Sequence, residues 1–202
     1  MTEDPVVLDG IRELINIGVG KAAGILGELT SSHVILEVPT LSIGEVGNAG
    51  GPGEVLGNAP LSMVFIDFSG PMRGRMAIMF SPESAANLVI LLTNEADTTA
   101  EMDMIRAETL TEVGNILING VIGTISNFLG QPLTYALPVY AQNRAAYLAT
   151  PFGEKDHFLF ASTRFQVKQR SVHGDMLIVL EMGSLQRLLP DFSRLIYKQI
   201  PE

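Results

Sequence analysis

The sequence predicts an α+β, α/β-sandwich-like fold: a largely antiparallel sheet, internally duplicated with pseudo-two-fold symmetry, with two long helices packed on it. An E-x-x-N motif occurs twice in 202 residues, and a proline follows each copy at the same distance. Two long segments have helical periodicity, and several short ones have the composition of strands. A common offset of 99 residues relates the two sets of motif residues, which are Glu13, Asn16 and Pro39, and Glu112, Asn115 and Pro138.

The first repeat begins with a predicted helix over residues 4–29. Pro5 lies near its start, where proline is common because its ring already has a helical φ. Apolar residues then recur at spacings of three and four, as on a buried helix face. These residues are Leu8, Ile11, Leu14, Ile15, Ala22, Ile25, Leu26 and Leu29.

Strands and a short helix complete the first repeat. Residues 33–39 predict a strand, and residues 44–60 contain six glycines, which indicates a loop or a loose sheet edge. Residues 61–68 and 75–80 predict a pair of strands joined by a turn, and residues 82–92 predict a short helix.

The second repeat is predicted to use the same order of elements. A long helix is expected over residues 102–129, strands at 133–137, 158–167 and 175–180, and helical turns from Ser184. Residues 94–99 form a polar link between the halves. Because neither half has enough apolar content to be stable alone, we expect one domain over residues 1–202, built from repeats at about 1–98 and 99–202.

The register of the repeat changes by one residue toward the end of each half. Residues 74–80 align with residues 174–180 at an offset of 100, whereas the motifs align at 99. One inserted residue in an intervening loop is the simplest explanation.

Composition excludes several classes of function. The net charge of −9 argues against nucleic-acid binding and against binding to an anionic membrane, because both need clustered cations. Without cysteine there is no disulfide, thiolate metal site or cysteine nucleophile, and the three histidines form no metal-binding motif. We therefore expect no metal site and no cofactor of the protein's own.

The sequence predicts a cytoplasmic protein. Its first residues lack the basic and apolar regions of a secretory signal, and its longest apolar runs, such as residues 88–92, are too short to cross a bilayer. We therefore expect no membrane insertion.

Each long predicted helix carries a polar stripe. The stripe residues are separated by four, three and four positions, which places them on one helix face: Asp9, Glu13, Asn16 and Gly20 in the first copy, and Glu108, Glu112, Asn115 and Asn119 in the second. An ordinary solvated face is the alternative explanation. The duplication argues against it, because surface positions diverge fastest, yet Glu and Asn persist while core positions such as Ile15 and Gly114 differ.

These residues resemble the CheC branch of the CheC/CheX/FliY family of chemotaxis phosphatases. The family signature is Asp or Ser, three residues, Glu, two residues, Asn, and Pro after a further twenty-two. The first copy matches it in full, at Asp9, Glu13, Asn16 and Pro39. The second copy matches at Glu112, Asn115 and Pro138, but Glu108 stands where the family has Asp or Ser.

The resemblance implies hydrolysis of the aspartyl phosphate on a CheY-type response regulator. It implies that Asn16 and Asn115 orient the attacking water, and that Glu13 and Glu112 form a salt bridge with the regulator's lysine, Asp9 also contributing to docking. A divalent metal, expected to be Mg²⁺, belongs to the partner's site.

A second function remains open, because CheC proteins also bind the receptor deamidase CheD. This protein is then an adaptor with little or no catalysis. The presence of both asparagines favours catalysis, since an adaptor is free to lose them. Because Glu108 places like charge one turn from Glu112, we expect the second site to be the weaker.

Overall fold

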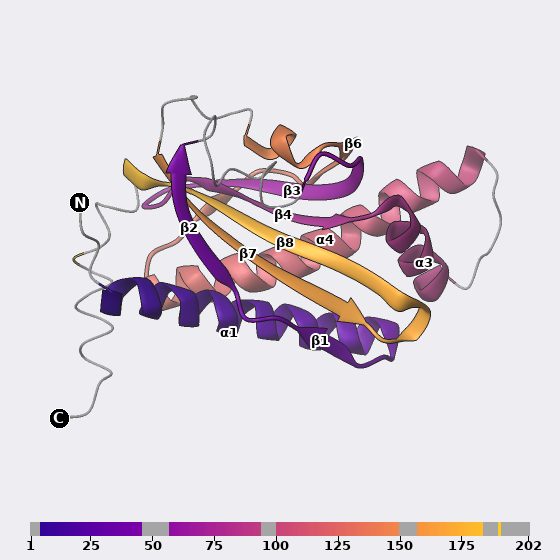
Figure 1. Cartoon of the computed structure of the whole chain (residues 1–202), viewed down its shortest axis with the longest axis horizontal. Coiled ribbons are helices and arrows are strands. Elements are labelled where there is room, and N and C mark those ends of the chain that lie inside the picture. The colour runs from indigo at the N-terminus through magenta and orange to yellow at the C-terminus, as the bar shows by residue number, and fades with distance from the viewer. Residues whose placement is uncertain (1–4, 46–56, 94–99, 150–156, 184–189, 191–202) are drawn as a thin grey trace.

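The protein folds into two layers, an antiparallel sheet and a layer of helices on one of its faces (Figure 1). The computed structural model describes residues 5–45, 57–93, 100–149, 157–183 and 190. The helices are α1 (Pro5–Thr30), α3 (Pro82–Thr93) and α4 (Ala100–Leu129), and their apolar faces share one hydrophobic core with the sheet. The predicted fold class is confirmed.

The sheet has the strand order β1-β7-β8-β4-β3-β5, with β2 also pairing with β7 and β6 with β3. Every pairing is antiparallel. The strands are β1 (Val34–Leu36), β2 (Thr40–Glu45), β3 (Leu61–Ser69), β4 (Gly74–Phe80), β5 (Thr134–Tyr135), β6 (Val139–Asn143), β7 (His157–Val167) and β8 (Val172–Glu181). Two 3₁₀ helices, η1 (Ala145–Ala149) and η2 (Gln169–Ser171), lie in the second half.

Most predicted elements are present, but the edge strands differ from the prediction. The single strands expected at residues 33–39 and 133–137 are each shorter, and a second strand follows, β2 or β6. The break falls at Pro39 and Pro138, because proline has no backbone N–H to donate to a neighbouring strand. The expected link at residues 94–99 and the helical turns from Ser184 lie outside the described residues.

A pseudo-two-fold axis passes through the centre of the sheet, where β4 pairs with β8. Ala77 pairs with Leu177, which is its own equivalent at the 100-residue offset. The pairs on either side are Met76 with Ile178 and Ile78 with Met176, so the same rotation exchanges them. The axis is therefore perpendicular to the sheet, and the helix layers of the two halves lie on the same side.

The halves exchange their edge strands. In the first half β1 and β2 pair with β7 of the second half, and in the second half β5 and β6 pair with β3 of the first. Within each half, the hairpins β3–β4 and β7–β8 are the internal pairings among the described strands. The sheet is thus one structure to which both halves contribute in alternation.

The insertion between the repeats is larger than the sequence alignment predicted. Phe68 pairs with Gly74, and Phe165 pairs with Gly174, so these pairs are equivalent. The phenylalanines are 97 residues apart and the glycines 100, which places three extra residues in the second hairpin turn. In each pair the aromatic ring covers the glycine, since a Cβ would come within 2.6 Å of Phe68 Cζ or 2.2 Å of Phe165 Cζ. The offset therefore falls from 99 at the motifs to 97 at these phenylalanines and then rises to 100, so the one inserted residue that we predicted is a net change of two residues fewer and three more.

Candidate functional site

The polar stripe of α1 lies on the exposed side of the helix. Most of the predicted apolar residues face the sheet, with Ile11, Ile15 and Leu26 at most 2% exposed. On the other side Asp9 and Glu13 are exposed, and Asn16 is half-buried. The sequence therefore dictates the orientation of the site, because burying the apolar stripe turns the motif residues outward.

Asp9 is held by an ion pair on its own helix. The Nη1 atom of Arg12 donates to Asp9 Oδ1 at 2.9 Å, three residues apart and largely exposed. In the second copy Thr111 stands in the place of Arg12, and its hydroxyl donates to the carbonyl of Ala107 at 2.6 Å. The leading acidic position is therefore anchored in the first motif by a contact that Thr111 cannot provide in the second.

The α4 motif has the same arrangement, with one further contact. Glu112 is exposed and Asn115 is half-buried, as at the equivalent positions of α1. The Nδ2 atom of Asn119 donates a hydrogen bond to Asn115 Oδ1 at 2.8 Å, one helical turn away. The sequence analysis placed Asn119 on the stripe but assigned it no role.

The two helices pack against each other and bring both motifs to one face of the molecule (Figure 1). The helices are antiparallel, and they come close at small residues: a Cβ on Gly18 would lie 3.1 Å from Val121 Cα, and one on Gly120 would lie 3.7 Å from Ile25 Cδ1. Asn16 and Asn115 are therefore separated by roughly 15 Å along the helix axes, at a rise of about 1.5 Å per residue. Both asparagines are half-buried, and the glutamate three residues before each of them is exposed.

The motif prolines lie in the sheet edges instead of the helices. Pro39 is buried in the break between β1 and β2, and Pro138 is half-buried in the break between β5 and β6. The chain keeps its connection to the sheet at each break, where the N–H of Glu37 donates to Arg164 O and that of Ala136 to Asp67 O, both at 2.9 Å. Proline thus shapes the backbone of each edge and presents no functional group.

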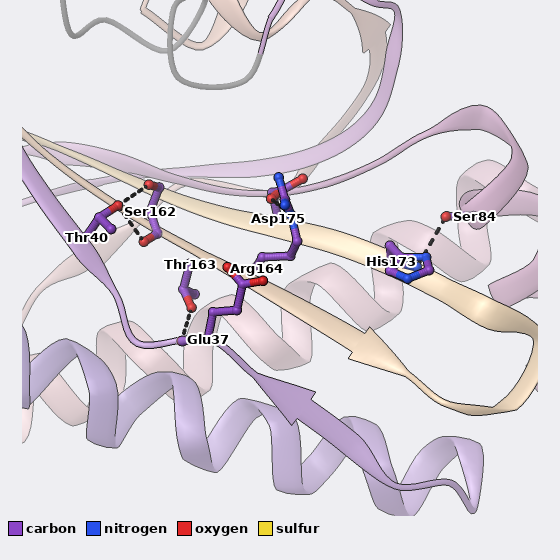
Figure 2. A network of polar contacts seen from close by, with 8 residues as sticks. All are labelled: Glu37, Thr40, Ser84, Ser162, Thr163, Arg164, His173 and Asp175. Atoms are coloured by element: carbon purple, nitrogen blue, oxygen red, sulfur yellow. Dashed lines mark hydrogen bonds and ion pairs between the residues drawn. The ribbon is translucent and has the colours of Figure 1, made fainter.

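A second polar cluster lies on the opposite face of the sheet (Figure 2). Arg164 of β7 donates to Asp175 of β8 at 3.2 Å, and Thr40 bonds to Ser162 at 2.9 Å. Asp175 has the same strand alternation as Leu177 and Val179, which pack against Leu148 of η1 instead of the helices. This cluster is therefore separate from the helix motifs.

The equivalent cluster in the first half has its charges exchanged. Asp67 of β3 and Arg75 of β4 form a bidentate ion pair at 2.6 and 2.9 Å, and the Arg75 guanidinium also stacks 4.1 Å from the ring centre of Phe65. Asp67 corresponds to Arg164 at the 97-residue offset, and Arg75 to Asp175 at the 100-residue offset. The repeat kept a cross-strand ion pair and reversed its direction, which sequence comparison at one fixed offset does not reveal.

In the Arg164–Asp175 pair, burial changes the pKa of the carboxyl group. Desolvation raises the pKa of Asp175 above its ordinary value of 3.8, and Glu37 acts in the same direction, while Arg164 and His173 oppose the change. Asp175 is thus a carboxylate held in a poorly solvated place by one guanidinium, Arg164.

No three His, Asp or Glu side chains converge into a metal site among the residues that the structure describes. Over the same residues, none of the helices combines the length and the hydropathy needed to cross a bilayer.

Residues 62–161 match the family described as Chemotaxis phosphatase CheX. Among solved structures, the chain is similar to FliY of Thermotoga maritima, with 15% identity, a TM-score of 0.74 and coverage of 99% of this chain and 100% of that one. It is also similar to a chain of the CheX–CheY–BeF3–Mg²⁺ complex of Borrelia burgdorferi, at 16% identity, a TM-score of 0.57 and coverage of 81% and 96%. The FliM middle domain of H. pylori matches at 11% identity and a TM-score of 0.63, over 93% and 99% of the two chains.

Proposed function

We propose, because this chain belongs to the CheC/CheX/FliY family of chemotaxis proteins, that it hydrolyses the aspartyl phosphate of a phosphorylated CheY-type response regulator. The observation that carries the proposal is the repeated placement of one Glu and one Asn, three residues apart, on the exposed face of both long helices. A structural neighbour that is itself a CheX–CheY complex supports the choice of partner.

The asparagines are the proposed water-positioning groups. Phosphoryl transfer asks the protein mainly for positioning and charge stabilisation, since little covalent chemistry is left for it to do. A carboxamide suits this task because its carbonyl oxygen accepts from a water proton and its NH₂ group donates to an oxygen. The half-buried positions of Asn16 and Asn115 restrict their side chains while leaving the amide groups accessible to a docked partner.

The glutamates are the proposed docking groups. Glu13 and Glu112 are more exposed than the asparagines and lie one turn away on the same helix face. An exposed carboxylate at this place forms a salt bridge with a cationic side chain beside the phosphorylated aspartate. The divalent metal of the reaction belongs to the regulator's acyl-phosphate site, so this chain supplies positioning alone.

The test is to mix the protein with a phosphorylated CheY-type regulator and follow the loss of acyl phosphate. Removing one water-positioning amide costs about 3 kcal/mol in the transition state, or about a hundredfold in rate at that site. Either Asn16→Ala or Asn115→Ala should leave a substantial part of the activity, whereas the double variant should approach the regulator's own decay rate.

The double variant should remain folded, because both side chains lie outside the apolar core and alanine has the higher helix propensity. Circular dichroism and thermal unfolding provide that control. A folded double variant with wild-type activity would exclude this mechanism. A wild-type protein that does not accelerate dephosphorylation would instead favour the adaptor function, for which CheD binding is the measurement.

A further inference from the structure

We infer that Asn119 is a positioning residue for the second motif, where it holds the Asn115 amide in one orientation, and that the first motif lacks such a group. The inference rests on the proposed function and adds a difference between its two sites. Its basis is the 2.8 Å hydrogen bond from Asn119 Nδ2 to Asn115 Oδ1.

The contact acts on the torsion that decides what the asparagine presents. The last torsion of an asparagine side chain is broad, so partial burial alone does not fix the direction of its amide group. The donor from Asn119 occupies one of the two acceptor positions on Asn115 Oδ1. Within the described part of the chain Asn115 makes no other side-chain hydrogen bond, so its second acceptor position and both of its N–H groups are left for a water and for the partner, in a defined direction.

Among the residues that the structure describes, the first motif has no counterpart to this hydrogen bond. Gly20 stands at the position equivalent to Asn119, 99 residues earlier, and has no side chain with which to reach Asn16. It is exposed, and a Cβ built on it meets no atom within 4 Å. A larger residue therefore fits at Gly20, which allows the contact to be transplanted.

The two sites then differ in separate kinetic constants. Asp9 and Glu108 each place a like charge one turn before a docking glutamate, but Arg12 pairs with Asp9, whereas Thr111 stands in that place in the second copy. The charge of Glu108 therefore acts on Glu112 without that compensation and raises KM at the second site. Asn119 acts on the amide and raises kcat there. Glu108 alone predicts that the second site is the weaker one. Once the regulator is bound, however, the second site should have the higher kcat.

The first experiment measures the amide itself, in the absence of any regulator. The ¹⁵N order parameters of the side-chain amides report their ps–ns motion. Asn115 should be more ordered than Asn16, and Asn119→Ala should lower Asn115 to the level of Asn16, while Asn119→Gln, which keeps a side-chain NH₂, should restore part of the order. Equal order at both sites, or no change in Asn119→Ala, overturns the inference.

The second experiment measures each site alone. With Asn16→Ala in the background, Asn119→Ala should lower kcat about fivefold and leave KM unchanged, the factor expected for freeing one side chain. With Asn115→Ala in the background, Gly20→Asn should exceed Gly20→Ala about fivefold in kcat. Gly20→Ala is the matched control because both substitutions remove the same helical glycine.

Equal kcat for Gly20→Asn and Gly20→Ala, or an Asn119→Ala change confined to KM, overturns the positioning role. If the wild-type protein does not accelerate dephosphorylation, the proposed function fails, and so does the kinetic role of Asn119. The order parameters still decide whether the hydrogen bond restrains the Asn115 amide.

Discussion

At the scale of single residues, the two repeats share two kinds of residue pair, and each kind is kept in a different way. Glu and Asn persist unchanged on both helices, whereas the cross-strand ion pair persists with its charges exchanged. An ion pair needs opposite signs and accepts either order, because its energy depends on the product of the charges. The asparagine and glutamate cannot exchange in this way, which is consistent with specific roles for each.

The reversed ion pair predicts opposite effects for two matched substitutions. Near pH 7, Asp175→Asn should stabilise the protein, because it removes a carboxylate whose charged form is disfavoured by burial. Asp67→Asn should destabilise it, because Arg75, with only 7% of its side chain exposed, loses its carboxylate partner. Thermal unfolding of the two variants beside the wild type measures both effects, and equal signs contradict the prediction.

The effect of Asp175→Asn should depend on pH. A pKa above 3.8 means that folded Asp175 holds its proton more tightly than Asp175 of the unfolded chain does. Protonated Asp175 therefore contributes its full stability to the wild-type protein below pH 3.8, and this contribution is lost as the pH rises through the folded-state pKa. The difference in Tm between Asp175→Asn and the wild type should therefore grow from about pH 4 upward. A difference that shrinks over this range contradicts the direction of the shift.

At the scale of elements, local periodicity predicted what local interactions determine. The two long helices and the two hairpins appear close to their expected bounds, because apolar spacing and turn residues lie within each segment. The edge strands β2 and β6 were missed because their partners, β7 and β3, lie far along the chain. The outward orientation of the motifs was predictable for the same local reason. The Asn119–Asn115 hydrogen bond was not, because it depends on the rotamers of both side chains, which the spacing of the two residues does not determine.

Helix α4 provides a matched pair of glycines that separates packing from helix propensity. A Cβ on Gly114 would lie 2.6 Å from Val64 Cγ1, whereas one on Gly123 would meet nothing within 4 Å. Gly114→Ala should lower the free energy of unfolding by about 1–3 kcal/mol through overpacking against β3. Gly123→Ala should raise it by up to about 1 kcal/mol through backbone entropy. Urea unfolding measures both, and similar midpoints would show that the approach of α4 to β3 is not tight.

At the scale of the whole molecule, the exchange of edge strands makes each half depend on the other. The pairs β1–β7 and β3–β6 both join one repeat to the other, so a separated half exposes unpaired strand edges. The predicted repeat bounds, residues 1–98 and 99–202, provide a direct test of this dependence.

Residues 1–98 and 99–202, expressed as separate chains, should each lack a cooperative thermal transition and should bind a dye for exposed apolar surface. Mixing the two chains should restore the transition, because every strand then has its partner. A half that unfolds cooperatively by itself would show that the exchanged edges are not required for folding.

The symmetry axis perpendicular to the sheet limits how many partners the chain can serve at one time. The two motifs share one face and lie roughly 15 Å apart along their helices. A domain of about 100 residues already has a radius of gyration of about 13 Å, so a regulator docked on one motif covers the other. The duplication therefore doubles the number of productive docking orientations without doubling the number of regulators that can bind at one time.

This reasoning predicts one bound regulator per chain, measured by titration with a beryllofluoride-activated regulator. Glu13→Lys, which reverses the charge of one docking group, should keep that stoichiometry and leave kcat determined by the remaining site, while kcat/KM falls. Glu13→Lys combined with Glu112→Lys should abolish binding. Two regulators bound to one chain would show that the motifs act as independent binding sites. In a cell, a chain that binds one regulator at a time gains from its second motif when the phosphorylated regulator is scarce. A chain with two independent sites would also remove the phosphorylated regulator faster when it is abundant.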